Sequence, residues 1–131
     1  MNAPSPKTDN AVAQTWQLEE GIVKEIYKPV NVNLEMMKGH IEDSLQAYGV
    51  GAWYLSDISQ LKSTEREARD YLAKHGIAAG AALLTYSPIS KLVGNLFLKF
   101  NKPKFPTRLF TSEEKALAWL REQRNRSLNN D

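Results

Sequence analysis

Apolar and polar residues alternate along two segments near the start of the chain. TWQL and GIVKEIYK follow this period of two, and the EEG between them suits a tight turn, so we expect a β-hairpin. AWYLSDI and IAAGAALLTY are almost continuously apolar, which is typical of strands covered on both faces. A shorter segment, TRLF, is the last predicted strand.

Helical spacing of apolar residues marks four further segments, at residues 33–48, 63–76, 88–100 and 111–124. Each should begin at a capping residue, and the candidates are Asn33, Ser63 or Thr64, Ser87 and Thr111. Thr64 with Glu67, and Thr111 with Glu114, match the spacing of capping boxes. In the third helix the spacing predicts one buried apolar face, made of Ile89, Leu92, Val93, Leu96, Phe97 and Phe100.

This alternation of strands and helices predicts an α/β fold. We expect a single mixed, mostly parallel five-stranded sheet with an N-terminal β-hairpin and four helices. A chain of 131 residues suits one domain. Residues 1–14 lack periodicity and are predicted to be a flexible leader, residues 15–124 to be the domain, and residues 125–131 to be a flexible tail.

Charge is distributed unevenly although the net charge is only +2. No acidic residue occurs between Asp70 and Glu113, whereas this interval contains Lys74, Lys91, Lys99, Lys102, Lys104 and Arg108. A polarised surface can attract an anionic partner even when the total charge is small. The alternative is a solvated surface that happens to lack Asp and Glu.

Several functional classes lack their sequence signals. Cysteine is absent, which removes thiol chemistry and Cys-ligated zinc. No export signal or membrane span is recognisable, so we expect a cytoplasmic protein. His40 and His75 are attributed to helix-surface charge, and no P-loop or nucleophile elbow occurs. We therefore expect no catalytic residue, no metal site and no cofactor.

Three stretches carry a resemblance to a known family: YLSDISQLKSTEREARDYL, SPISKLVGNLFLKFNKP and PTRLFTSEEKALAWL. They resemble uncharacterised bacterial SpoIIAA-like domains, which have the STAS fold of anti-sigma-factor antagonists and are related to the CRAL-TRIO lipid-transfer fold. The resemblance implies a phosphorylatable serine after a strand-terminal aspartate, and Asp57 and Ser59 are the nearest positions. Ile58 and Gln60 depart from the Asp-Ser-Ser-Gly pattern of the antagonists.

Hydroxyl groups near a predicted helix start are therefore the first candidate site. A phosphate on Ser59, Ser63 or Thr64 would meet unpaired N–H groups and the positive end of the helix dipole. The competing interpretation is that Ser63 or Thr64 simply caps the helix. The leading functional hypothesis is a non-catalytic regulatory module that recognises a protein partner through residues 57–64.

The basic segment SKLVGNLFLKFNKPKF is the second candidate site. Lysine stems and aromatic rings can contact the carbon of an amphipathic anion while the ammonium groups meet its phosphate. The alternative hypothesis is thus binding of a lipid or other amphipathic anion at Lys91, Asn95, Lys99, Lys102, Lys104 and Arg108. Nucleic acid is disfavoured because the segment has no recognised binding motif. Leu98 and the apolar residues near the hairpin are candidates for a homodimer surface.

Overall fold

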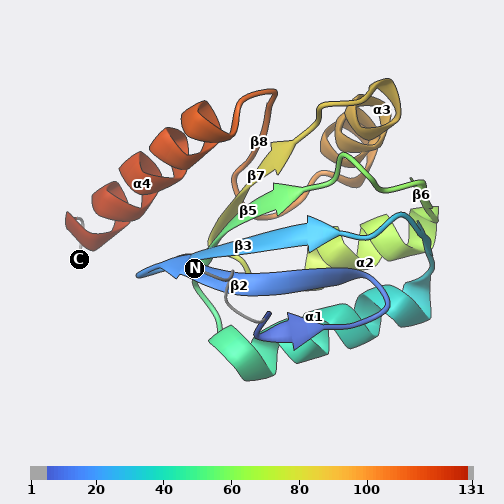
Figure 1. The fold of residues 1–131 in the computed structure, drawn as a ribbon, viewed down its shortest axis with the longest axis horizontal. Coiled ribbons are helices and arrows are strands. Elements are labelled where there is room, and N and C mark those ends of the chain that lie inside the picture. Colours follow the sequence, from blue (N-terminus) through green and yellow to red (C-terminus); the bar gives the residue numbers. More distant parts are fainter. Residues whose placement is uncertain (1–5, 130–131) are drawn as a thin grey trace, which may run out of the picture.

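The computed structural model describes residues 6–129 (Figure 1). Its strands are β1 (Thr8–Asp9), β2 (Ala13–Glu19), β3 (Ile22–Tyr27), β4 (Asn31–Val32), β5 (Trp53–Asp57), β6 (Ser63–Thr64), β7 (Gly80–Leu84) and β8 (Thr107–Phe110). Its helices are α1 (Leu34–Tyr48), α2 (Arg66–His75), α3 (Pro88–Leu96), the π-helical turn η1 (Phe97–Asn101) and α4 (Glu113–Asn129). No helix within residues 6–129 combines the length and apolar composition needed to cross a membrane.

The main sheet has six strands in the order β1-β2-β3-β5-β7-β8. The first two pairs are antiparallel, and β3, β5, β7 and β8 are parallel, so the predicted mixed α/β sheet is confirmed. The predicted number of five strands is wrong. The additional strand is β1, which is too short to show alternation and is recognisable only from its pairing with β2. A second, two-stranded sheet joins β4 to β6.

Two helical layers cover opposite faces of the main sheet. Figure 1 shows α1 and α2 on one side and α4 on the other. The alternation of side chains along each strand explains this arrangement, because neighbouring residues of a strand point to opposite faces. Tyr54 belongs to the core under α1 and α2, whereas Leu55 belongs to the core under α4. Helix α4 packs against β5, β7 and β8.

Order at both ends of the chain extends further than the sequence predicted. The predicted leader contains β1 and the start of β2, and residues 1–5 lie outside the described part. Asn10 explains this order, because its side-chain oxygen accepts hydrogen bonds from the backbone N–H groups of Val12 and Ala13. At the other end, α4 continues to Asn129 through most of the predicted tail, of which residues 130–131 lie outside the described part.

Helix starts were predicted with mixed success. Asn33 and Ser87 cap α1 and α3 as expected, each accepting a hydrogen bond from the backbone N–H three residues later. The predicted capping box at Thr111 is wrong, because α4 begins one residue later and the hydroxyl of Ser112 accepts from the N–H of Lys115 at 3.3 Å. The prediction for α2 is also wrong, for a reason that concerns the first candidate site.

Candidate binding surface

Ser59 lies in the segment after β5 and is held there by hydrogen bonds to neighbouring residues. Both the backbone N–H, at 3.0 Å, and the hydroxyl of Ser59 donate to the carboxylate of Asp57. The hydroxyl of Ser87 donates to the carbonyl of Ser59 at 3.2 Å, and the side chain of Ser59 is only half exposed. The structure therefore places Asp57 beside Ser59, as the sequence suggested, with the serine hydroxyl already engaged.

Ser63 and Thr64 form the short strand β6 and do not cap α2. The backbone pairs with β4, since the N–H of Glu65 donates to the carbonyl of Val32 at 2.9 Å. This pairing keeps the chain extended, so α2 begins only at Arg66, and its N-cap Glu65 makes no side-chain capping bond. The exposed Ser63 hydroxyl instead donates to Asn31 at 2.6 Å.

Only part of the predicted apolar face is buried: Phe97 lies in the core and Val93 packs against it, as predicted. Ser90, Gly94 and Phe97 point inward, whereas Ile89 and Leu92 are 56% and 60% exposed. Gly94 permits this close approach, since a Cβ atom there would lie 2.8 Å from a methyl carbon of Leu109. The segment is helical as predicted, but it contains more apolar residues than the core covers.

In the π-helical turn η1, too, the buried residues differ from the predicted ones. Phe97 is buried against Phe105, with their ring centroids 6.4 Å apart, whereas Phe100 is 74% exposed. A π-helix turns less per residue than an α-helix, so two residues three apart diverge more in direction. Lys102 ends the turn in the left-handed region at φ 48°, and its N–H donates to the carbonyl of Phe97 at 3.1 Å.

Two rows of side chains consequently face outward along α3 and η1, since residues three or four apart share one side of a helix. The apolar row is Ile89, Leu92, the partly buried Leu96 and Phe100, and the polar row is Lys91, Asn95 and Lys99, followed by the exposed Lys102 directly after η1. We call both rows together the α3 surface. Within residues 6–129, none of its lysines forms an ion pair.

Two predicted members of the basic site lie elsewhere. Lys104 stands in the following loop, where its N–H donates to the carbonyl of Ala73 at the end of α2. Arg108 lies on β8, with its guanidinium 5.2 Å from the ring centroid of Phe110. The acid-free segment therefore divides into the α3 surface and separate cations, because the chain turns away after Lys102.

Acidic groups near the ends of the α3 surface are largely paired. Glu113 forms an ion pair with Lys24 at 2.7 Å, and Asp70 lies 3.8 Å from the guanidinium of Arg66. Partial burial, followed by the charges of Glu113 and Asp57, raises the pKa of Tyr86, which precedes α3. These carboxylates border the surface without neutralising its lysines.

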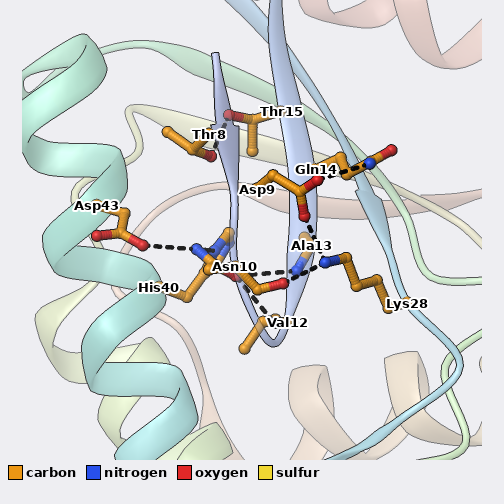
Figure 2. Close-up of polar contacts among 10 residues, drawn as sticks. All are labelled: Thr8, Asp9, Asn10, Val12, Ala13, Gln14, Thr15, Lys28, His40 and Asp43. Atoms are coloured by element: carbon orange, nitrogen blue, oxygen red, sulfur yellow. Dashed lines mark hydrogen bonds and ion pairs between the residues drawn. The ribbon is translucent and has the colours of Figure 1, made fainter. Parts of the chain in front are cut away.

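Sequence reasoning missed a buried polar network under α1. His40 is 3% exposed, so its assignment to helix-surface charge is wrong. Its Nε2 lies 2.9 Å from the carboxylate of Glu25, to which the hydroxyl of Ser56 also donates at 2.7 Å. Figure 2 shows Asn10 reaching both His40 and Asp43 on α1. Its position in the helix could have predicted this burial, because His40 falls between Met37 and Ser44 on the side of α1 that faces the core.

Asn10 also sets the hydrogen-bonding state of this histidine. Its side-chain N–H groups point at Nδ1 of His40, at 3.1 Å, and at the carboxylate of Asp43, at 2.9 Å. Nδ1 must then accept, which leaves Nε2 to donate to Glu25. Burial raises the pKa of the neighbouring Tyr27 well above its ordinary value, and Glu25 raises it further. Within residues 6–129 no three metal-ligating side chains gather into a possible metal site.

The family described as "Domain of unknown function (DUF7793)" matches residues 16–124. The chain belongs to this family. Its members' shared segment thus spans the domain from β2 to α4, including the whole α3 surface.

One solved structure supports the fold of this DUF7793 domain. The chain is similar to an uncharacterised protein of the DUF3478 family with a SpoIIAA-like fold from Shewanella loihica PV-4, at 16% identity and a TM-score of 0.57, covering 92% of this chain and 98% of that one. A protein of unknown function from Arthrobacter sp. FB24 has 25% identity, with 81% and 96% of the two chains covered and a TM-score of 0.32. No curated protein matches. The SpoIIAA-like fold is therefore confirmed.

Proposed function

We propose that this DUF7793 domain is a non-catalytic binding module that attaches to an anionic lipid surface through the α3 surface. The observation that supports the proposal is the exposure of Ile89, Leu92 and Phe100 directly beside lysines that have no acidic partner in the described structure. Neighbouring exposed apolar side chains of this size are unusual unless a partner covers them.

The energetics favour a lipid surface for such a pattern. A lysine near an anionic membrane contributes about 1 kcal/mol; Lys91 and Lys99 lie on one side of one helical segment, and the exposed Lys102 directly follows it. Apolar side chains that enter the acyl boundary add about 0.8 kcal/mol for each buried CH₂ group. Binding would be reversible and dependent on salt, because exposed charges are screened beyond about 10 Å at 0.1 M ionic strength.

The hypothesis of a protein partner at residues 57–64 stays a prediction. A SpoIIAA-like fold is compatible with a regulatory module, but a fold alone does not select a partner. A phosphate on Ser59 would be placed against the carboxylate of Asp57, to which the hydroxyl now donates. Two like charges at this separation repel each other, so the geometry favours the α3 surface over a phosphoswitch at Ser59.

Sedimentation with lipid vesicles tests the proposal. Vesicles of phosphatidylcholine with a third of phosphatidylglycerol should retain the protein at low salt, and pure phosphatidylcholine should retain much less. Lys91→Glu with Lys99→Glu should release the protein. Lys38→Glu with Lys115→Glu changes the net charge equally on α1 and α4 and should leave retention nearly unchanged.

A second pair of variants tests the apolar row. Phe100→Ser should weaken retention, whereas Leu128→Ser, at a residue of similar exposure on α4, should not; the two exposed fractions are 74% and 67%. Equal retention of all the charge and apolar variants would contradict attachment through the α3 surface.

A further inference from the structure

Residues 6–11, which contain β1, form a strap between β2 and α1, and we call this segment the β1 strap. On one side, the N–H of Lys7 donates to the carbonyl of Thr15 on β2 at 2.7 Å. On the other side, Asn10 reaches two residues of α1, His40 and Asp43, as Figure 2 shows. Asn10 therefore links the strap to a buried histidine.

The orientation of the Asn10 side chain is fixed at both of its ends. Its oxygen accepts from the backbone N–H groups of Val12 and Ala13, at 2.9 and 3.1 Å. Rotating the amide by half a turn would set its N–H groups against these two donors and its oxygen against the carboxylate of Asp43. The strap therefore fits an imidazole of His40 whose Nδ1 accepts, which is the neutral form.

A second proton on the imidazole removes this fit. A protonated histidine carries an N–H at both nitrogens, so Nδ1 of His40 would point a donor at a donor of Asn10. A buried donor without an acceptor is costly. Histidine ordinarily takes up this proton between about pH 5 and pH 8. The two charge states of His40 thus differ in whether they can hold the strap.

The carboxylates around His40 favour the protonated form. Glu25 of β3 lies 2.9 Å from Nε2, and Asp43 lies three residues further along α1. Burial raises the pKa of Tyr27 on β3 and of Tyr54 on β5, so both phenols stay neutral. The hydrogen bond from Asn10 opposes these carboxylates. The other elements around His40 bring apolar side chains to the same core: Ala13 from β2, Leu72 from α2 and Phe97 from η1.

We propose that His40 and Asn10 form a pH-sensitive clasp, which holds the β1 strap against α1 while the imidazole is neutral and opens when Nδ1 takes up a proton from solvent. Asp43 then replaces Asn10 as the acceptor for the new N–H. The closed clasp binds one proton fewer than the open one, so closure weakens as pH falls. The clasp uses no residue of the α3 surface and does not depend on the proposed lipid attachment.

A second contact of the strap does not respond in this pH range. The ammonium group of Lys28 donates to the carboxylate of Asp9 and to the carbonyl of Asn10. The hydrogen bond from Lys28 lowers the pKa of Asp9, so this carboxylate stays charged at the pH that protonates a histidine. The strap therefore remains tethered beside the hairpin while its contact with α1 opens.

Nuclear magnetic resonance of the full chain, recorded between about pH 8 and pH 5, tests the clasp. The sequence has one other histidine, and His75→Gln identifies the imidazole signals of His40. As His40 takes up its proton, the hydrogen-exchange protection of the Val12 and Ala13 amides should fall about tenfold or more, with the same midpoint. The amide of Thr85, which bonds to the end of β8, should keep its protection.

Three results would overturn the clasp. His40 could stay neutral throughout the titration, or the amides of Val12 and Ala13 could keep their protection while it titrates. An equal loss of protection at Thr85 would show general unfolding instead of a local opening.

Exchanging the amide and the carboxylate around His40 should reverse the response. Asn10→Asp with Asp43→Asn keeps the net charge and sets a carboxylate against Nδ1, where it favours the protonated imidazole. Protection of the Val12 and Ala13 amides should then rise as pH falls, since the new carboxylate can still accept from both. A response of the same sign as in the wild-type protein would refute the role of Asn10.

A matched exchange elsewhere on α1 controls for the altered charges. Gln46 donates to Glu42 at 3.2 Å on the exposed side of the helix, so Gln46→Glu with Glu42→Gln exchanges another bonded amide and carboxylate. This variant should keep the wild-type response. If the variant at Asn10 and Asp43 does not fold, the titration of the wild-type protein decides by itself.

Discussion

Replacing His40 with alanine is expected to destabilise the protein strongly. The substitution removes the donor 2.9 Å from a carboxylate oxygen of Glu25, whose side chain is 8% exposed, and leaves that charge buried with fewer partners. It also removes the edge-to-face contact between the imidazole and Tyr27, whose ring centroids are 5.8 Å apart. Leaving a buried charged acceptor short of a hydrogen bond costs about 1–3 kcal/mol or more, and the cavity left by the imidazole adds to this, so we expect a loss of about 3–5 kcal/mol. Total stabilities are about 5–15 kcal/mol, so a large share would be lost.

Urea denaturation followed by circular dichroism measures this loss. With a slope of about 2 kcal/mol per molar urea, a loss of about 4 kcal/mol lowers the midpoint by about 2 M. His75→Ala is the matched control, because that histidine is exposed at the end of α2 and mainly contacts the ring of Tyr71. Its midpoint should change by no more than about 0.3 M, corresponding to the roughly 0.5 kcal/mol typical of surface substitutions. Equal midpoints for the two variants would refute the buried network.

Two further predictions concern glycine packing and acid stability. Gly80→Ala should destabilise the protein by about 1–3 kcal/mol, because the added Cβ would lie 2.3 Å from the ring of Trp53. Gly39→Ala should stabilise the protein by roughly 0.5–1 kcal/mol, because this helical position is open. Thermal unfolding compares the two variants, and equal melting temperatures would contradict this prediction. Hydrogen bonds from two arginines of α4, Arg121 first, lower the pKa of Glu19 below its usual value near 4.5. The stabilisation is complete when pH is above the pKa of Glu19 in the unfolded chain, and it is lost as pH falls through the lower pKa of the folded protein. Glu19→Gln should therefore cost about 1 kcal/mol or less at pH 7 and progressively less below pH 4.5. Urea midpoints at several pH values would measure this dependence. A constant difference across that range would contradict the assignment.

Much of the fold could be predicted from local patterns. The hairpin, the parallel strands and the caps Asn33 and Ser87 all depend on residues close together in the chain. The start of α2 could not be predicted, because Ser63 and Thr64 are recruited into a strand by β4, more than thirty residues earlier. Local capping preference is worth about 1 kcal/mol, which backbone pairing and tertiary contacts can override.

The candidate sites, like the fold, could be predicted only in part. The positions of Lys91, Asn95 and Lys99 along one helical segment follow from spacing, so their association could be predicted. The exposure of Phe100 could not, because it depends on the π-helical turn and on how Phe97 packs against the rest of the core.

The sequence by itself determined the order of the helices and of the five longer strands, the α/β class and the uneven distribution of charge, since periodicity and composition are properties of neighbouring residues. Only the tertiary structure decided which apolar residues of α3 are covered, and that His40 is buried against Glu25. The physical reason is that burial and hydrogen bonding depend on groups brought together from distant segments, and a local period marks more apolar positions than the core can cover.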